Sequence, residues 1–158
     1  MNTMVDQEAL VDEFKSVYSA LTKDSDFNGL LSSIYTEDLL FTDCFHEVSG
    51  LNEFTDYCRS LYKNVTSCRF DFFEEFVKHD EAIVSWRLNY KSRWLKGGKE
   101  IKVDGVSHIK YRKEDKLQDE TERLKIFFHK DYFDGGAMLY EHLPFIGLSI
   151  RQIKKRVG

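Results

Sequence analysis

The feature that most constrains this chain is an alternation of apolar and polar residues over positions 82–94. The apolar series is Ala82, Val84, Trp86, Leu88, Tyr90 and Trp94, and the polar series between them is Ser85, Arg87, Asn89, Lys91 and Arg93. Successive side chains of a β-strand point to opposite faces of the sheet, so a period of two predicts a long strand. One face of this strand is expected in the core and the other in water.

Three neighbouring segments are predicted to be strands as well. They cover residues 68–79, where Phe70, Phe72 and Phe76 alternate with polar residues, then 100–111 and 124–133. Gly97-Gly98 is a hairpin turn signal, and a polar stretch from Arg112 to Arg123 separates the last two strands. Connections of this length join neighbouring antiparallel strands, so the sequence predicts an antiparallel meander.

The first part of the chain follows helical spacing instead. Leu10, Phe14, Val17, Tyr18 and Leu21 form one apolar stripe. Asp24-Ser25-Asp26 can cap a second short helix that carries Leu30, Leu31 and Ile34. A third amphipathic helix is predicted between Gly50 and Val65, with Asn52 as its N-cap.

A short strand is predicted over residues 39–46, with Phe41, Asp43 and Phe45 on one face. Because an apolar sheet face needs a cover, the helices are expected to fill the hollow of the sheet. The predicted fold class is α+β, with N-terminal helices packed into a strongly curved antiparallel sheet around an apolar pocket. Only one proline and no repeat or low-complexity tract occur in the 158 residues, which predicts a single domain over 1–158.

Composition limits the possible functions. Aromatic residues make up 15% of the chain, and such a share indicates a dense core or a lined cavity. A net charge of -4 argues against a nucleic-acid-binding protein. The N-terminus lacks a secretory signal and no apolar stretch reaches the ~20 residues of a membrane span, so a cytoplasmic protein is expected.

The sequence predicts neither a metal site nor a cofactor. The histidines are scattered at His46, His79, His108, His129 and His142. Cys44, Cys58 and Cys68 lack metal-ligand spacing and are expected to be reduced thiols. No dinucleotide fingerprint, P-loop or serine-hydrolase elbow is present.

The C-terminal segment 143–158 is predicted to be a basic amphipathic helix. From residue 144 onward it has four basic residues and no acidic one. Such a helix can lie on anionic lipid, close the domain or pack on a partner subunit. The last two roles are favoured, because the segment is short and lacks tryptophan.

Several motifs in their order resemble the nuclear transport factor two-like superfamily and, within it, the SnoaL-like domains. The matching segments are Tyr35-Thr36-Glu37-Asp38-Leu39-Leu40-Phe41-Thr42-Asp43, then Gly50 opening a helix, Gly105-Val106-Ser107-His108-Ile109, and His129-Lys130-Asp131-Tyr132-Phe133-Asp134. The tail from Tyr140 to Pro144 with its basic helix resembles a bacterial subgroup whose role is not settled. The resemblance implies a cystatin-like cone with an internal cavity, found in isomerases, dehydratases, cyclases and hydrolases and also in silent binding or dimerisation modules.

The resemblance also implies roles for individual residues. Asp43 stands where the ketosteroid-isomerase-like branch has its base, and Asp131 stands where the SnoaL-like branch has its general acid/base, with His129 beside it. Ser107 stands where the isomerase branch has a protonated acid as oxyanion donor, which argues against a close copy of that enzyme. The expected pocket residues besides Ser107 are Tyr18, Tyr35, Phe41, Phe45, Tyr57 and Trp86.

Two main functions stay open on this basis. The first is a cofactor-free isomerase, dehydratase, cyclase or hydrolase that acts on a small apolar molecule through an inward aspartate. The second is a non-catalytic ligand-binding or dimerisation module that forms a homodimer through the outer face of the sheet, whose alternation of Arg87, Asn89, Lys91 and Arg93 suits a wet interface. A peripheral membrane or regulatory role led by the basic tail is the third.

Overall fold

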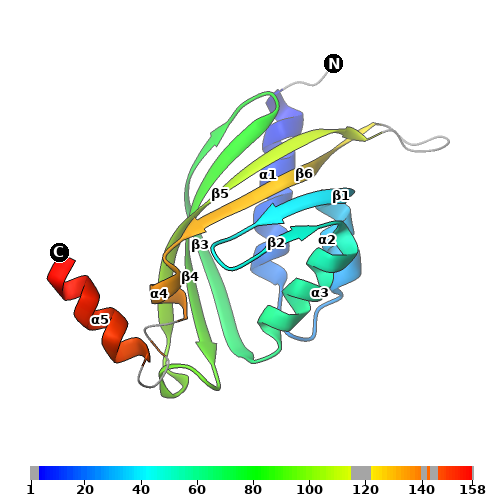
Figure 1. Cartoon of the computed structure of the whole chain (residues 1–158). Coiled ribbons are helices and arrows are strands. Elements are labelled where there is room, and N and C mark those ends of the chain that lie inside the picture. Colours follow the sequence, from blue (N-terminus) through cyan, green and yellow to red (C-terminus); the bar gives the residue numbers. More distant parts are fainter. Residues whose placement is uncertain (1–3, 115–121, 140–141, 143–145, 158) are drawn as a thin grey trace.

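The computed structural model describes residues 4–114, 122–139, 142 and 146–157, and within these it shows helices packed on one curved sheet (Figure 1). The helices are α1 Met4–Ala20, α2 Phe27–Ile34, α3 Leu51–Tyr62, the 3-10 turn η1 Lys96–Gly98, α4 Gly135–Met138 and α5 Ile146–Val157. The strands are β1 Tyr35–Thr42, β2 Glu47–Ser49, β3 Val65–Val77, β4 Glu81–Ser92, β5 Ile101–Glu114 and β6 Arg123–Phe133. The α+β prediction is confirmed.

The six strands form one sheet in the order β2-β1-β6-β5-β4-β3. The strands β3 to β6 form the predicted antiparallel meander. One pairing departs from the antiparallel pattern, because β1 runs parallel to β6, with Phe41 opposite His129. This pairing brings together segments about 90 residues apart, and parallel neighbours need such a long crossover.

The helices α1, α2 and α3 cover the concave face of the sheet, as Figure 1 shows. The apolar stripe of α1 is buried in the same core cluster as α2, α3 and the strands. Within the predicted capping segment Asp24-Ser25-Asp26, the N-cap of α2 is Asp26, whose Oδ1 accepts a hydrogen bond from the Gly29 N–H at 3.1 Å. Asn52 does not cap α3. The helix begins at Leu51 after Gly50, whose φ of 93° is a conformation that glycine adopts without strain.

The strand β4 points as its alternation predicts, with Ala82, Val84 and Trp86 buried. Two predicted inward residues differ. A register shift in β3 between Phe72 and Glu75 reverses the alternation, so that Phe76 is 65% exposed. Trp94 lies beyond the last residue of β4 and is 73% exposed. The alternation of apolar and polar residues therefore predicts which side chains are buried only where the pairing of the strands has no register shift.

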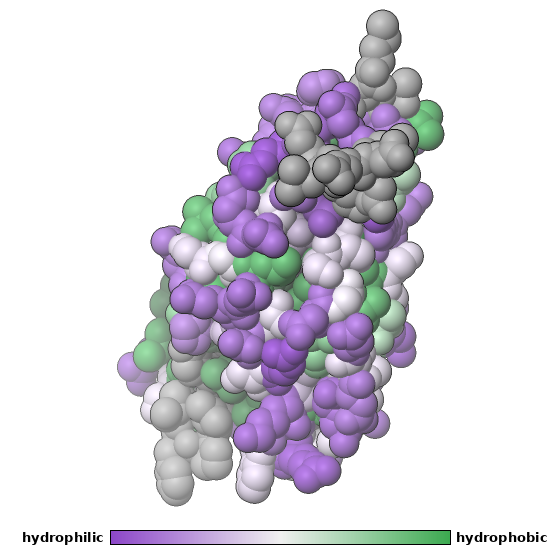
Figure 2. Space-filling view, turned by 90° about the vertical axis from the view of Figure 1, so that its right-hand side faces the viewer, coloured by the Kyte–Doolittle hydropathy of each residue, from purple (hydrophilic) through white to green (hydrophobic). Residues whose placement is uncertain are grey.

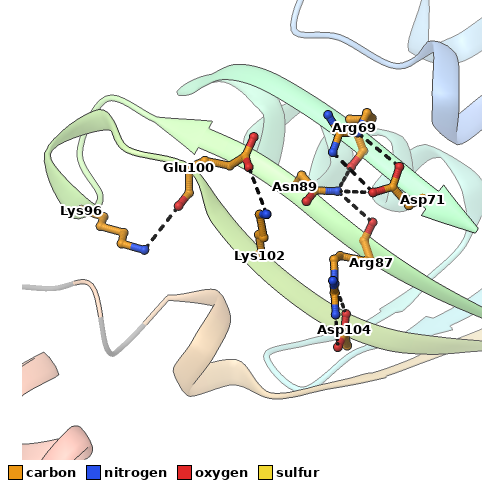
Figure 3. A network of polar contacts seen from close by, with 8 residues as sticks. All are labelled: Arg69, Asp71, Arg87, Asn89, Lys96, Glu100, Lys102 and Asp104. Atoms are coloured by element: carbon orange, nitrogen blue, oxygen red, sulfur yellow. Dashed lines mark hydrogen bonds and ion pairs between the residues drawn. The ribbon is translucent and has the colours of Figure 1, made fainter.

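The outer face of β3, β4 and β5 carries a network of polar contacts, shown in Figure 3. Arg87 binds Asp104 through two hydrogen bonds of 2.6 and 3.0 Å. Asn89 donates to Asp71 at 2.9 Å, and Asp71 also pairs with Arg69. This face is polar, as the alternation of β4 predicts.

The helix-covered side of the molecule is shown in Figure 2. Hydrophilic side chains spread over most of it, with apolar atoms visible in separate small patches. No helix in the described part of the chain is long and apolar enough to cross a membrane.

The helix α5 lies outside the body of the domain in Figure 1. Lys154 forms an ion pair with Asp134, just before α4. Ile153 and Val157 are 61% and 83% exposed, and neither belongs to the core clusters. The predicted segment 143–158 begins with residues outside the described part of the chain, including Pro144.

Candidate functional site

A cavity of about 810 Å³ lies between the helices and the sheet. Of the ten residues predicted for the site, nine line it, and these are Tyr18, Phe41, Asp43, Phe45, Tyr57, Trp86, Ser107, His129 and Asp131. Tyr35 lies behind the wall, almost completely buried. The lining is otherwise mostly apolar, which is typical of a small-molecule site with few polar groups.

Asp131 and Ser107 meet on neighbouring strands. They are direct partners in the β5–β6 ladder, so both side chains lie on the concave face. The Ser107 hydroxyl donates to Asp131 Oδ1 at 2.5 Å. The Trp86 Nε1–H from β4 in turn donates to Ser107 Oγ at 2.9 Å. Three adjacent strands thus contribute to one polar cluster.

His129 joins this cluster from β6. Its Nε2 lies 2.7 Å from Asp131 Oδ1, and its Nδ1 lies 2.7 Å from the Tyr35 hydroxyl. The Tyr35 hydroxyl is also 2.6 Å from that of Tyr18. One set of donors satisfies every contact: Tyr18 to Tyr35, Tyr35 to Nδ1, and an Nε2–H to Asp131. A continuous series of hydrogen bonds therefore connects Tyr18 of α1 with the Asp131 carboxylate of β6, and it runs through Tyr35 and the His129 imidazole.

Burial keeps the two tyrosines of this hydrogen-bond series protonated, so that both can act as donors. Desolvation raises the pKa of Tyr35 well above its ordinary value, and the same cause raises the pKa of Tyr18. Both phenols therefore keep their protons at neutral pH. His129 is 1% exposed and packs against the rings of Phe14 and Phe41, so its orientation is set by packing as well as by hydrogen bonds.

Asp131 lines the cavity together with Ser107 and His129, and it is more exposed than His129. Its side chain is 19% exposed, against 1% for His129. Among the described residues, Oδ1 receives the hydrogen bonds of the cluster and Oδ2 receives none. One carboxylate oxygen is thus held by the protein while the other is available to a bound molecule.

Asp43 also lines the cavity, but not as predicted. The strand β1 ends at Thr42, so Asp43 lies in the turn before β2 and does not share a strand face with Phe45. Its Oδ1 accepts the backbone N–H groups of Phe45 and His46 at 2.7 and 2.8 Å. Its Oδ2 accepts the Tyr57 hydroxyl at 2.6 Å, and burial, followed by this bond, raises the pKa of Tyr57. Asp43 thus holds the turn in an Asx-type arrangement.

Sequence reasoning missed much of the cavity wall. The lining also includes Phe14, Phe54, Phe70, Phe72, Leu88, Tyr90 and Phe133. Those on β3 and β4 share the inward parity of Trp86, so the alternation itself could have identified them. The helix residues could not be separated from ordinary core positions by spacing alone.

Gly105 is a further residue that the sequence did not single out for the site. It pairs with Trp86 across β4 and β5. A Cβ atom at this position would lie 2.3 Å from the indole ring, so glycine makes the room that the ring occupies. No group of three metal-ligating side chains occurs within the described residues.

Known proteins resemble this chain in both sequence and structure. The sequence profile described as SnoaL-like domain matches residues 14–119, about two thirds of the chain. The chain belongs to the SnoaL-like domain family. A search of curated proteins gave no match.

Solved structures show the same fold in other SnoaL-like and related proteins. One, provisionally described as a SnoaL-like polyketide cyclase from Jannaschia sp. CCS1, has 12% identity and a TM-score of 0.67, covering 88% of this chain and 94% of its own. AclR from Streptomyces galilaeus, provisionally described as a hydroxylase, has 13% identity and a TM-score of 0.63, with 87% and 95% covered.

A third similar structure comes from Catenulispora acidiphila DSM 44928. This protein, described as having a ketosteroid isomerase-like fold and solved with trimethylamine, has 10% identity and a TM-score of 0.65, with 85% and 93% covered. At such identities the likeness concerns the fold of this SnoaL-like chain, and its chemistry has to be argued from its own residues.

Proposed function

We propose that this SnoaL-like protein binds a small apolar molecule and moves a proton on it by cofactor-free acid–base chemistry, with Asp131 as the catalytic group. One observation carries the proposal: a buried series of hydrogen bonds ends on Oδ1 of Asp131, a residue that lines an apolar cavity, while Oδ2 accepts no hydrogen bond from the described residues. Isomerisation, dehydration, cyclisation and hydrolysis are the reaction classes that this arrangement serves. The pocket residues provide the apolar walls.

The chain of contacts gives each member a role. Asp131 Oδ2 removes a proton from carbon beside an electron-withdrawing group of the bound molecule and returns it to another position. His129 and Ser107 hold the other oxygen and fix the direction of the carboxylate. The apolar wall excludes water, which strengthens the interaction of the carboxylate with developing charge.

Ser107 does not act as an oxyanion donor in this arrangement. Its hydroxyl proton is directed to Asp131 and not into the cavity. The strong oxyanion stabilisation of a steroid isomerase is therefore not part of the proposal. Asp43 is likewise assigned to the turn and to Tyr57, since both of its carboxylate oxygens accept hydrogen bonds from these groups.

Proton abstraction is tested with 2-tetralone, an apolar ketone whose α-hydrogens exchange with D2O. Mass spectrometry of the ketone measures deuterium uptake with and without the protein. The wild type is expected to accelerate exchange, and Asp131→Asn to lose about 100-fold or more of that acceleration. Asp43→Asn is the matched control, because it removes the other cavity carboxylate. Equal activity of wild type and Asp131→Asn, or no acceleration by the wild type, contradicts the proposed base.

A non-catalytic ligand-binding role is the second candidate. It is favoured by the fact that the hydroxyl and imidazole donors of the cluster all bind other members of the cluster. Every donor from Tyr18 to Ser107 is used inside the network, as in a purely structural cluster. Nile red, a neutral apolar dye, reports cavity occupation independently of turnover. Dye binding by the wild type together with absent proton exchange favours this candidate over the first.

The outer sheet face is the proposed site of a homodimer. Phe73 and Tyr132 are 61% and 52% exposed, while the central strands between them carry the polar network of Figure 3. Aromatic residues and arginines beside hydrogen-bonding groups are typical of interfaces. Light scattering at micromolar concentration is expected to give twice the mass of 18.7 kDa, and Tyr132→Glu to give the monomer. A wild-type monomer contradicts the dimer.

A further inference from the structure

Two chain segments that form the open end of the cavity carry an unusual charge. They are residues 59–65, at the end of α3 and the start of β3, and residues 91–99, at the end of β4 and through η1. Together they hold six basic residues and no acidic one, in a chain of net charge -4. The basic residues are Arg59, Lys63, Lys91, Arg93, Lys96 and Lys99. We call these two segments the basic rim.

The two segments are neighbours in space. Val65 pairs with Ser92 in the β3–β4 ladder, and the Arg93 N–H donates to the Asn64 carbonyl at 3.2 Å. Figure 1 places the ends of α3 and β4 at the same end of the molecule. The two segments that carry the six cations therefore lie together at one end of the domain.

Large apolar side chains stand among these cations at the cavity opening. Leu61 and Trp94 both line the cavity, yet they are 49% and 73% exposed. A side chain that is both lining and exposed marks the opening. An exposed tryptophan in a segment rich in lysine and arginine is the composition of a membrane-interface anchor, where the ring sits at the headgroups and the cations meet anionic lipid.

Acidic groups near the rim neutralise only part of it. Glu100 directly follows Lys99, and its carboxylate lies 3.8 Å from Lys102 Nζ, outside the rim. Asp56 pairs with Arg59 at 2.9 Å within α3, and Asp26 is engaged as the N-cap of α2. Asp24 lies beside Lys23 in the α1–α2 connection. Lys63 and Arg93 are exposed, and neither has an acidic partner among the described residues.

The helix α5 adds to the same charge. It begins near α4, whose Met138 lines the cavity, and Lys154 ties it to Asp134. Lys155 and Arg156 are exposed, as are its apolar residues Ile153 and Val157. Exposed cations and apolar side chains on one helix are the features of an interfacial helix.

We infer that the basic rim docks on an anionic phospholipid bilayer, so that the cavity opens onto the membrane and takes its apolar molecule from there. The charge of the rim selects the anionic surface, and Trp94 enters the interface. An apolar molecule then reaches the cavity without crossing water. Only the identity of the bound molecule as a small apolar one rests on the proposed function, whereas the docking of the rim does not.

Vesicle flotation tests the docking with the full chain. Vesicles of phosphatidylcholine alone are compared with vesicles that contain 30% phosphatidylserine, at low and at physiological salt. The protein is expected to float with the anionic vesicles only, and more weakly at higher salt. Acrylamide quenching of tryptophan should fall on binding, because Trp94 becomes shielded while Trp86 is buried throughout.

Substitutions identify the surface. Lys63→Glu with Arg93→Glu should weaken the partition coefficient about 30-fold or more, since each cation near the surface contributes about 1 kcal/mol. Trp94→Ser should weaken it about tenfold. Lys78→Glu is the charge control for Lys63→Glu alone, because both single substitutions change the net charge equally and the two lysines flank opposite ends of β3.

The outcomes separate clearly. Absent binding to anionic vesicles, equal loss in Lys78→Glu, or unchanged binding of the rim variants overturns the inference. Binding to heparin without binding to vesicles assigns the rim to a soluble polyanion and also overturns it. Asp131→Asn should float like the wild type, so a failure of the proposed chemistry leaves this result intact.

Discussion

Replacing Gly105 with alanine tests how closely the cavity wall is packed around Trp86. The ideal Cβ at this position lies 2.3, 2.4 and 2.7 Å from Cη2, Cζ2 and Cζ3 of the indole. Carbon atoms pack at about 3.5–4.0 Å, so the ring has to move by more than about 1 Å. Such a movement pulls Trp86 Nε1 away from Ser107, its partner at 2.9 Å.

The expected cost follows from these two effects. Overpacking of a core site costs about 1–3 kcal/mol, and the loss of one hydrogen bond adds about 1 kcal/mol. The free energy of unfolding should therefore fall by about 2–4 kcal/mol. For a domain of this size that corresponds to a Tm lower by roughly 5–15 °C.

Thermal and urea unfolding followed by circular dichroism measure the effect, and a double-mutant cycle assigns it. In a Trp86→Leu background the ring is absent, so Gly105→Ala should cost much less, with a coupling free energy of about 1.5 kcal/mol or more. A Gly105→Ala variant as stable as the wild type, or one equally destabilised in both backgrounds, would refute the reasoning. Trp86→Leu alone serves as the reference for the cavity that it creates.

Three further predictions concern single side chains. Burial raises the pKa of Tyr35, so above about pH 10 the phenol loses its proton in the unfolded protein but keeps it in the folded protein. The contribution of Tyr35 to the free energy of unfolding should therefore fall by about 1.4 kcal/mol per pH unit above that pH. Urea unfolding between pH 9.5 and 11 measures this pH dependence, and Tyr35→Phe should reduce it by the contribution of Tyr35. The same pH dependence in wild type and variant would show that Tyr35 ionises in the folded state. Asp43→Ala removes three hydrogen bonds and should lower stability by roughly 2–3 kcal/mol, whereas Asp43→Asn keeps an acceptor and should lose about half as much; equal losses would mean that the turn does not depend on the acceptor. Burial raises the pKa of all three thiols, but only Cys44 is exposed, so Ellman's reagent should modify one thiol faster than the others in the native protein and all three in denaturant. Rapid modification of all three thiols in native protein would contradict the described cavity wall.

Local patterns determined much of the fold. The alternation over residues 82–94 predicted β4 and its buried face, because strand geometry alone places Val84 and Trp86 on the same side. Asp26 was found as an N-cap because the free N–H groups of a helix start need a nearby acceptor. Asn52 was wrong for the complementary reason: Gly50 already provides the backbone conformation that begins α3.

Tertiary structure decided the arrangement of the site. The sequence placed His129 and Asp131 on one strand face, since they are two residues apart. It could not place Ser107 opposite Asp131 or Tyr35 against His129, because ladder register and helix packing join residues that are distant in the chain. Asp43 shows the same limit, since its carboxylate bonds with a turn and with Tyr57 of α3. Alternation and capping are local and can be read along the chain, whereas the hydrogen-bonded surroundings of the two cavity carboxylates, Asp43 and Asp131, are decided by contacts between strands, turns and helices.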